Sequence, residues 1–474
     1  MSESASGNAG LSDEALESQT TERSRRAHES VGNGGNTGIS AYDAHHPPAG
    51  ELIDQCVHCG FCLPVCPTYI LWKEEMDSPR GRIYLMKMAA EGDAAINQTW
   101  VSHFDACLGC MACMTACPSG VDYGKLIEAT RAQIERRYTR PSSEKRFRRF
   151  LFSTFTHPER LSLLALPLRL YQKSGLQDLV RQIGIPKLLP KRLQAMETLL
   201  PQVPAPEKVP ELIPAQGERR RRVGLMLGCV QRVFFPQVNA ATARVLAAEG
   251  CEVVAPAAQP CCGALLVHTG EEEHAVQLAR RTIDLFEKAE VDTIIINAAG
   301  CGSTVKDYGY LLRDDPEYAE RAKAFSAKCR DILEFLAELE PRAPLSPLST
   351  SVSADDRLIR VAYHDACHLQ HAQRVRSQPR TVLSRIPNLE ILEIPEAAVC
   401  CGSAGIYNLV QPETAAELGD RKAAHVTSVN PDMVVSSNPG CLLQLQSSLT
   451  RAGRNVPVHH GIELVDAAIR GVRL

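Results

Sequence analysis

The second half of the chain alternates short apolar runs with longer stretches in which apolar residues recur every three to four positions. The apolar runs fall at 223–229, 251–256 and 292–297, and again at 358–367, 389–395 and 433–441. Between them, segments such as 240–250 and 274–289 carry the helical period. Strands that alternate with helices at this spacing are typical of parallel α/β units. We therefore predict two small α/β domains, 222–340 and 357–474, joined by a link rich in Pro and Ser.

The first half of the chain lacks this alternation. Residues 1–48 are rich in Ser, Gly, Asn and charge and show no apolar period, which predicts a disordered tail. Residues 49–139 are dominated by closely spaced cysteines. Residues 140–221 carry helix-like apolar patches at 147–152 and 166–172 and end in a proline-rich spacer. This last pattern predicts a helical connector between two parts of the protein.

Composition and charge exclude several classes of protein. The chain is 44% hydrophobic and 23% charged with a formal net charge of -3, as in soluble globular proteins. This balance disfavours nucleic acid as a partner, because counterion release rewards a basic face. Basic residues gather in the connector, where 12 Lys and Arg stand against 3 Asp and Glu between Arg140 and Arg192. They form either a solvated helix pair or a surface for acidic partners or anionic lipid. No run approaches the roughly 20 apolar residues of a spanning helix, so we expect any membrane contact to be peripheral.

The 18 cysteines are the most informative residues. In a short secreted chain they would indicate disulfides, but here the chain is long and the cysteines are clustered, without an apolar signal segment. We therefore expect a reducing cytoplasm and metal ligands. Two internal duplications contain 16 of the cysteines: 56–66 recurs at 107–117, and 229–301 recurs at 367–441. The other two are expected to be ordinary buried thiols.

The first duplication repeats C-x2-C-x2-C-x3-C-P, the pattern of bacterial ferredoxins. In that pattern each 4Fe–4S cluster takes three thiolates from one run and the fourth from the other. One predicted cluster has the ligands Cys56, Cys59, Cys62 and Cys117, and the other has Cys107, Cys110, Cys113 and Cys66. A zinc site of the C-x2-C type needs neither the third cysteine of each run nor the C-P ending, so the pattern disfavours zinc. No C-x2-C pair is followed directly by His, so the haem-attachment motif is absent. Two clusters with crossed ligands predict an electron-conducting domain.

The second duplication places one cysteine after a strand, an adjacent pair followed by Gly, and a fourth cysteine after another strand. The two sets are Cys229, Cys261, Cys262 and Cys301, and Cys367, Cys400, Cys401 and Cys441. Adjacent thiolates can serve a metal site or a redox-active thiol set, whereas a vicinal disulfide needs a strained ring and an oxidising setting. His364 and His368 can complete a site, or they can be ordinary polar groups near a strand end. Because only the second set has such histidines, we expect it to form the better metal site.

The duplicated C…CCG…C pattern behind a ferredoxin-like domain resembles the cysteine-rich domains of heterodisulfide reductases and their relatives. Those domains commonly end in C-x2-C. Here Ala298 and Asn438 stand three positions before Cys301 and Cys441, so both sets lack the fifth thiolate. A different iron–sulfur cluster, a zinc ion and a redox-active thiol set all remain open.

Longer strings resemble the iron–sulfur subunit of glycolate oxidase, among them CVHCGFCLPVCPTY, SPRGRIYLMK, NAAGCGSTVKDYG, CCGSAGIYNL and NPGCLLQL. The resemblance covers roughly Leu52 to Ile469. It implies that FAD-linked partner subunits oxidise glycolate to glyoxylate, while this subunit passes the electrons toward a quinone acceptor. The chain agrees with this division, because it has no strand–GxGxxG–helix fingerprint for a dinucleotide and no obvious flavin site. Hydride chemistry needs such a cofactor, so we expect no catalytic residue in this chain.

Together these features predict an α+β multidomain oxidoreductase subunit. An α-helical ferredoxin-like 2×(4Fe–4S) domain at 49–139 is followed by the basic connector and two pseudo-symmetric α/β cysteine-rich domains. The expected cofactors are two 4Fe–4S clusters, with the cysteine-rich domains as candidates for a further iron–sulfur or zinc site. We expect a cytoplasmic protein, peripheral on the inner face of the cell membrane. The alternatives are a related dehydrogenase subunit for glycerol 3-phosphate or D-lactate, and a zinc scaffold or redox sensor.

Overall fold

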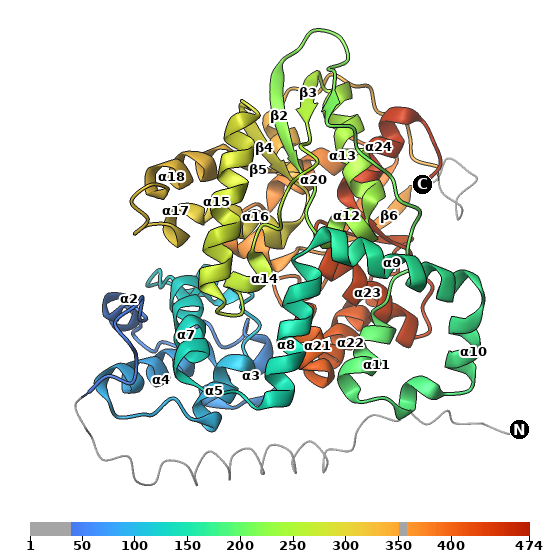
Figure 1. Cartoon of the computed structure of the whole chain (residues 1–474). Coiled ribbons are helices and arrows are strands. Elements are labelled where there is room, and N and C mark those ends of the chain that lie inside the picture. The colour runs from blue at the N-terminus through green and yellow to red at the C-terminus, as the bar shows by residue number, and fades with distance from the viewer. Residues whose placement is uncertain (1–38, 350–357) are drawn as a thin grey trace, which may run out of the picture. The chain divides into compact units, whose positions relative to one another are not determined.

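The computed structural model describes residues 39–349 and 358–474 (Figure 1). The chain forms two compact units within these residues. The first unit comprises 39–107 and 116–138, and the second comprises 108–115 and the described residues from 139 onward. The first 38 residues of the predicted tail lie outside the described part, as does most of the second half of the predicted link.

Short helices build the first unit. They are α2 (Gly50–Asp54), α3 (Pro67–Trp72), η1 (Glu75–Asp77), α4 (Pro79–Glu91), α5 (Gln98–Asp105) and α7 (Tyr123–Arg137), and α6 (Ala112–Ala116) lies at its boundary. Ser78 caps α4 by accepting from the Gly81 N–H at 3.0 Å, and Asn97 caps α5 by accepting from the Trp100 N–H at 3.0 Å. Each cap satisfies an N–H that a helix start leaves unbonded. These elements match the helical domain that the sequence predicts.

Residues 39–48 fall within the predicted tail but pack on the helices of the first unit. Tyr42 is buried, and its hydroxyl donates to the Met86 carbonyl at 3.3 Å. The Asp43 carboxylate accepts from Arg136 Nε at 2.8 Å and from Gln133 Nε2 at 2.8 Å. The bond from Arg136 is the main reason that the pKa of Asp43 lies below its usual value. Composition gave no sign of this anchoring, because the partners of Asp43 lie some 90 residues away in the sequence.

Helices of the connector pack on both α/β domains of the second unit. They are α8 (Ser142–Phe155), α9 (Pro158–Lys173), α10 (Leu176–Gln182), η2 (Ile185–Leu188) and α11 (Lys191–Thr198). Leu161 and Phe234 share an apolar cluster, which joins α9 to α12 (Val230–Phe234) of the first α/β domain. Leu151 shares another with Ile406 and Leu409, which joins α8 to the region of α21 (Tyr407–Val410) in the second. None of the described helices is long and apolar enough to cross a membrane.

A mainly parallel sheet organises the first α/β domain, in the order β1-β3-β2-β4-β5. Its strands are β1 (Leu212–Ile213), β2 (Arg221–Met226), β3 (Cys251–Val254), β4 (Thr293–Ile296) and β5 (Cys329–Asp331). The helices after α12 are α13 (Pro236–Ala248), α14 (Ala264–Val267), α15 (Glu272–Lys288), α16 (Ala299–Lys306), α17 (Tyr308–Leu311), α18 (Ala319–Lys328) and α19 (Ile332–Glu338). Only β1 is antiparallel to its neighbour among these strands. The three predicted runs correspond to β2, β3 and β4, whereas β1 and β5 are too short to show a pattern.

A fully parallel sheet organises the second α/β domain, in the order β7-β6-β8-β9. Its strands are β6 (Ile359–Tyr363), β7 (Leu389–Glu393), β8 (Met433–Ser436) and β9 (Val458–His460). The remaining elements are the π-helix η3 (His368–Ala372), α20 (Ser377–Leu383), α22 (Pro412–Ser428), α23 (Pro439–Arg451) and α24 (Gly461–Arg470). The predicted runs correspond to β6, β7 and β8. The parallel pairing that the alternating pattern predicts is confirmed in both sheets.

One hydrophobic core joins the two sheets. Leu225 of β2, Val361 of β6 and Ile462 of α24 are fully buried members of the same cluster. Burying a side chain of this size contributes roughly 1.5–3 kcal/mol, so this shared core strongly favours a fixed arrangement of the two α/β domains. The backbone also joins them, since the Ala299 N–H donates to the Ser437 carbonyl at 3.0 Å. This bond joins the segments that follow β4 and β8. These segments lie at the carboxyl ends of parallel strands, where α/β proteins commonly place their ligand-binding sites.

Candidate iron–sulfur and thiol sites

The two ferredoxin-like loops share one backbone form. In each, the residues on both sides of the second cysteine are left-handed: φ is 53° at His58 and 86° at Gly60, and 62° at both Gly109 and Met111. Turns of this kind can direct successive backbone N–H groups toward one centre, where they stabilise negative charge. The loops therefore fit the negatively charged cluster that their cysteine spacing predicts. In each loop only one of the two left-handed positions is Gly. It follows the second cysteine in the first loop (Gly60) and precedes it in the second loop (Gly109).

The cysteines of the two loops differ in their exposure to solvent. In the first loop Cys59 is exposed and Cys56 is half-buried, whereas Cys107, Cys110 and Cys113 of the second are buried. The segment 108–115, with Cys110 and Cys113, groups with the second unit, and the other six ferredoxin-type cysteines belong to the first. The ligand set of each cluster stays a prediction.

A buried charge network lies beside Cys66 in the first unit. The Arg82 guanidinium is 1% exposed and pairs with the Asp77 carboxylate at 3.2 Å. It also donates to Thr68 Oγ1 at 3.2 Å, and this hydroxyl lies 3.3 Å from Cys66 Sγ. Burial alone would lower the pKa of Arg82, but the negative charge available at Cys107 and its other neighbours raises it instead. A guanidinium held in this way stabilises thiolates and the anionic group that they would bind.

The first thiol set lies after the carboxyl ends of β2 and β4. Cys229 directly precedes α12, Cys301 lies in α16, and the Cys229 and Cys261 sulfurs are 3.4 Å apart. The hydrogen bond with Cys261, and then complete burial, hold the pKa of Cys229 well above its usual value. Cys261 lowers the pKa of Cys262, but the bond with Cys301 and burial outweigh this and raise it. Cys229 and Cys262 therefore favour the protonated form.

The second thiol set lies at the equivalent ends of β6 and β8. Cys367 Sγ is 3.9 Å from Cys400 Sγ and 3.6 Å from Nδ1 of His368. The hydrogen bond with Cys400 holds the pKa of Cys367 well below its usual value, although burial opposes this. The pKa of Cys401 is also well below its usual value, chiefly because Cys400 and Cys441 hydrogen-bond to it. Two thiols of this set therefore favour the thiolate, which is the form that binds metals.

His364 adds an imidazole to the second set. One ring nitrogen of His364 and the Cys401 and Cys441 sulfurs all lie within 4.8 Å of one another, and all three residues are buried. The backbone N–H of His364 donates to the Val435 carbonyl at 2.8 Å, which fixes this residue at the end of β6. Imidazole and thiolate are ligands that zinc and some iron–sulfur centres accept. Met226 holds the corresponding place in the first set, three residues before its leading cysteine, and offers no such nitrogen.

Asn438 links the second set to the first α/β domain. Its Nδ2 donates to Cys441 Sγ at 3.4 Å, and its Oδ1 accepts from the Gly300 N–H at 3.2 Å. Gly300 lies in α16 beside Cys301. Asn438 thus donates to the sulfur of Cys441 from the position where the resembling domains carry a further cysteine. The missing thiol is visible in the sequence, whereas this link is not, because Gly300 lies 138 residues from Asn438.

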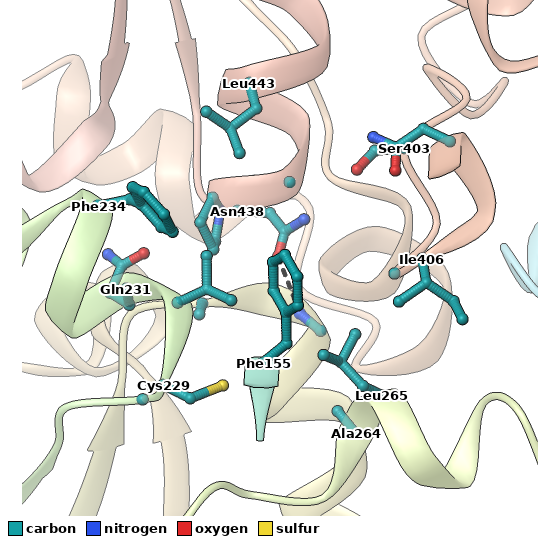
Figure 2. A pocket seen from close by; sticks show the side chains of 18 of the residues that line it. Phe155, Cys229, Gln231, Phe234, Ala264, Leu265, Ser403, Ile406, Asn438 and Leu443 are labelled. Carbon is teal, nitrogen blue, oxygen red and sulfur yellow. Dashed lines mark hydrogen bonds between the residues drawn. The ribbon is translucent and has the colours of Figure 1, made fainter. Parts of the chain in front are cut away.

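Both thiol sets line a single cavity of about 270 Å³ in the second unit. The cysteines on its wall are Cys229, Cys261, Cys262, Cys301, Cys367, Cys400 and Cys441. The His268 and His368 rings, one from each α/β domain, also line it, with their centroids 4.7 Å apart. Figure 2 shows Cys229 on one side of Phe155 and Ile406 on the other. The fold therefore gathers two sets of redox-capable thiols, about 140 residues apart in the chain, around one space.

Two ferredoxin-type loops, followed by two thiol sets at the carboxyl ends of parallel sheets, define an iron–sulfur protein of the electron-transfer class. Family models agree over each part: the 4Fe-4S dicluster domain matches 52–121, the cysteine-rich domain matches 223–306 and 361–446, and the glycolate oxidase iron-sulfur subunit linker region matches 143–200. The chain belongs to the glycolate oxidase iron–sulfur subunit family.

Individual relatives support this membership. The "Probable glycolate oxidase iron-sulfur subunit" of Bacillus subtilis is 40% identical over 427 residues, which cover 88% of this chain and 94% of the relative. The "Glycolate oxidase iron-sulfur subunit" of Escherichia coli is 36% identical over 428 residues, covering 89% and 95%. "Lactate utilization protein A" of Geobacillus kaustophilus is 26% identical over 246 residues, covering 52% of this chain and 99% of that protein.

These findings confirm the class that the sequence predicts. The chain is an electron-transfer component of an oxidoreductase, carries 4Fe–4S clusters and contains cysteine-rich domains. When bound, 4Fe–4S clusters supply one-electron transfer at potentials that the surrounding charges and hydrogen bonds adjust. The residues described above would hold the clusters and adjust their potentials: thiolates as ligands, backbone N–H groups in the left-handed loops, and the Arg82 guanidinium.

Proposed function

We propose that this chain is the electron-transferring subunit of a glycolate oxidase complex. A flavin-bearing partner oxidises glycolate to glyoxylate, and this chain passes the electrons through its two clusters toward a quinone. The observation that carries the proposal is the match to two glycolate oxidase iron–sulfur subunits over nearly nine-tenths of the chain. The chain lacks a dinucleotide-binding fingerprint, which supports the proposal that glycolate is oxidised on the partner.

We assign the cluster ligands by the crossed pattern. Cys56, Cys59, Cys62 and Cys117 bind one cluster, and Cys107, Cys110, Cys113 and Cys66 bind the other. The matching left-handed turns of the two loops support equivalent clusters. The Arg82 guanidinium, which donates to the Thr68 hydroxyl beside Cys66 Sγ, puts positive charge near the second cluster, and we expect this charge to raise the cluster's reduction potential.

We propose the domain division that the sequence predicts, with the difference that residues 39–48 of the predicted tail pack on the ferredoxin-like domain. The divisions are a tail at 1–48, the ferredoxin-like domain at 49–139, the connector at 140–221 and cysteine-rich domains at 222–340 and 357–474. The last two are pseudo-symmetric. Their strand orders support this, because β3-β2-β4-β5 and β7-β6-β8-β9 follow one scheme when β1 is set aside. The thiol sets occupy equivalent places in that scheme.

We propose that the second thiol set is the stronger metal site. Cys401, Cys441 and His364 converge on one point, and Cys367 and Cys400 lie beside them. Four thiols and one imidazole suit an iron–sulfur cluster or a zinc ion. The first set, with Met226 in place of the histidine, binds metal more weakly or stays a reduced thiol cluster.

We propose a cytoplasmic protein that contacts the inner face of the cell membrane through the connector. Leu163, Leu166 and Leu170 of α9 are 73%, 64% and 70% exposed, and Leu188 of η2 is 85% exposed. The connector is also the basic part of the chain. Exposed apolar side chains among basic ones suit the surface of an anionic bilayer.

A second candidate is a related dehydrogenase subunit that serves D-lactate or glycerol 3-phosphate oxidation. The likeness of half the chain to lactate utilization protein A favours lactate over glycerol 3-phosphate. A zinc scaffold or redox sensor is the third candidate, and the thiol sets alone would suit it.

Reduction of the clusters by substrate separates these candidates. The chain is purified anaerobically with its flavin partners, and cluster reduction is followed by EPR after adding glycolate, D-lactate or glycerol 3-phosphate in turn. We expect glycolate to reduce the clusters fastest and the iron content to be about eight per chain before any further cluster is counted. Faster reduction by either other substrate would favour the related dehydrogenase, and zinc without iron would favour the scaffold.

A further inference from the structure

The connector contributes an apolar wall to the cavity that the two thiol sets share. This wall includes Phe155 of α8, Leu161, Leu164 and Leu168 of α9, and Met196 of α11. Phe234 of α12 and Ile406, just before α21, extend it on the sides of the two α/β domains. Figure 2 shows Phe155 in the middle of this space, with Phe234 and Ile406 on opposite sides. The part of the chain that the family model names a linker is therefore also a wall of the cavity.

No Lys, Arg, Asp or Glu lines the cavity among the described residues. A carboxylate or phosphate ligand would meet neither Lys nor Arg there, only the imidazoles of His268 and His368 beside the thiols, and poorly balanced charge is costly in an apolar setting. The cavity thus disfavours glycolate, nucleotides and fatty acids. It favours a neutral molecule with a large apolar part.

One polar side chain on the wall has no partner in the described structure. Gln231 of α12 is 2% exposed, and neither its Nε2 nor its Oε1 makes a hydrogen bond within the described residues. Buried amides are nearly always bonded, so an orphaned one calls for a ligand or a water. Gln231 lines the cavity two residues from Cys229, and Figure 2 shows both on the same side of Phe155. A neutral ligand with a carbonyl oxygen can accept from its Nε2.

We infer that this cavity binds the quinone acceptor, with the quinone carbonyl bonded to Gln231 and the tail along the leucines of α9. This inference rests on the proposed function, which names a quinone as the electron acceptor, and it adds where on the chain the quinone binds. A quinone fits the residues that line the cavity, because it is neutral, has carbonyl oxygens that accept hydrogen bonds and carries an apolar tail. Its ring lies beside thiols of both sets, where electrons from any metal centre that they hold need to travel only a short distance.

The electrons and protons balance in this scheme. Oxidation of glycolate to glyoxylate on the partner releases two electrons and two protons. The electrons pass one at a time through the clusters, and the quinone takes up both, with two protons from solvent, to become the quinol. No other oxidant or reductant is needed.

The wall also reaches the surface that we propose to contact the membrane. Leu164 lines the cavity and is 42% exposed, and its neighbours Leu163 and Leu166 are more exposed still. A lipophilic molecule dissolved in a bilayer would meet this edge of α9 before any thiol.

Photolabelling tests the site on the full chain without its partners. The chain is purified anaerobically and irradiated with an azido derivative of a short-tailed ubiquinone, and labelled peptides are identified by mass spectrometry. We expect labels within 150–200 and 228–234 that excess unlabelled decylubiquinone suppresses. Labels confined to peptides that do not line the cavity, or labelling that excess quinone leaves unchanged, would overturn the inference.

Binding of decylubiquinone to variants supplies a second test. Gln231→Leu removes the amide at nearly constant size and should weaken binding about ten-fold, as loss of one buried hydrogen bond does. Leu168→Trp should fill the cavity and weaken binding at least as much. Ser162→Trp places the same bulk on an exposed position of α9 and should leave binding unchanged. If Leu168→Trp fails to fold, Leu164→Phe replaces it. Equal affinities for the parent, the Gln231 variant and the cavity-filling variant would overturn the inference.

The two proposals fail in different ways. If glycolate does not reduce the clusters of the complex but the cavity is labelled, the glycolate function fails and the quinone site stands. If glycolate reduces the clusters but quinone neither labels nor binds the cavity, the quinone site fails and the glycolate function stands.

Discussion

Cys66 and Cys117 each end a four-cysteine run and precede a proline. In the ferredoxin pattern such a cysteine binds the cluster of the other run. Cys66→Ser should therefore remove the same EPR signal as Cys110→Ser, and Cys117→Ser the same signal as Cys59→Ser. In each variant about four irons should remain of the eight in the two clusters. Low-temperature EPR of the dithionite-reduced protein measures this, and the opposite pairing of signals would contradict crossed ligation.

Single residues of the second thiol set should also contribute more to metal binding than their counterparts in the first set. Cys401→Ser should lower metal content and quinone-linked activity more than Cys262→Ser, because Cys401 lies with Cys441 and His364 in one ligand group. His364→Ala should reproduce part of the loss, whereas Met226→Ala in the first set should leave the metal content unchanged. Metal analysis of anaerobically purified variants gives the comparison. Equal losses at the two sets would show that they work symmetrically.

At the scale of elements, the last helix of each α/β domain begins with the same kind of N-terminal cap, a capping box. Asp331 caps α19 by accepting from the Leu333 N–H, and Glu334 accepts from the Asp331 N–H. His460 and Glu463 make the same reciprocal bonds at the start of α24. Such capping boxes satisfy N–H groups at a buried helix start. Burial raises the pKa of Asp331 and of Glu463 to about 7.

The raised pKa of Asp331 predicts a pH dependence of stability. An unfolded Asp ionises near pH 4 and the folded one near 7, so the folded state binds the proton more tightly. This contribution is present below about pH 4 and is lost as the pH rises through about 7. Asp331→Asn keeps a cap oxygen and cannot ionise, so it should be more stable than the parent at pH 8, by roughly 2 to 4 kcal/mol.

Unfolding measured between pH 5 and 8 tests this prediction. The decline of stability with pH should be shallower in Asp331→Asn than in the parent. Asp314→Asn is the control, because this carboxylate is 67% exposed and should leave the slope unchanged. The same slope in Asp331→Asn and the parent would argue against the raised pKa.

Helix α9 is expected to carry the membrane contact. Replacing Leu163, Leu166 and Leu170 together by Ser should weaken binding to anionic vesicles more than about ten-fold, since each leucine buried in lipid contributes roughly 1.5–3 kcal/mol. Co-sedimentation with phosphatidylglycerol vesicles measures the loss. Leu358→Ser, which changes a leucine 56% exposed outside the connector, is the matched control. Equal loss in both variants, or none in either, would remove α9 from the membrane contact.

At the scale of the whole molecule, the chain carries electrons and leaves substrate oxidation to a partner. We expect the purified chain to bind no flavin and to leave glycolate unchanged, because it lacks a dinucleotide fingerprint. Absorbance spectra of the pure chain, before and after adding glycolate, check both points. A bound flavin that bleaches with glycolate would place the oxidation on this chain instead. The complex with the proposed flavin subunits serves as the positive control.

The sequence by itself determined the class of the protein, its cluster type and most of its strands. The cysteines of each run are three or four positions apart, and runs such as 292–297 are apolar enough to show a buried strand, so both signals are local. Short strands such as β5 left no pattern. Only the tertiary structure brought His364 to Cys401 and Cys441 and gathered both thiol sets and the connector around one cavity. These contacts join segments tens to hundreds of residues apart, and their geometry depends on how whole sheets and helices pack.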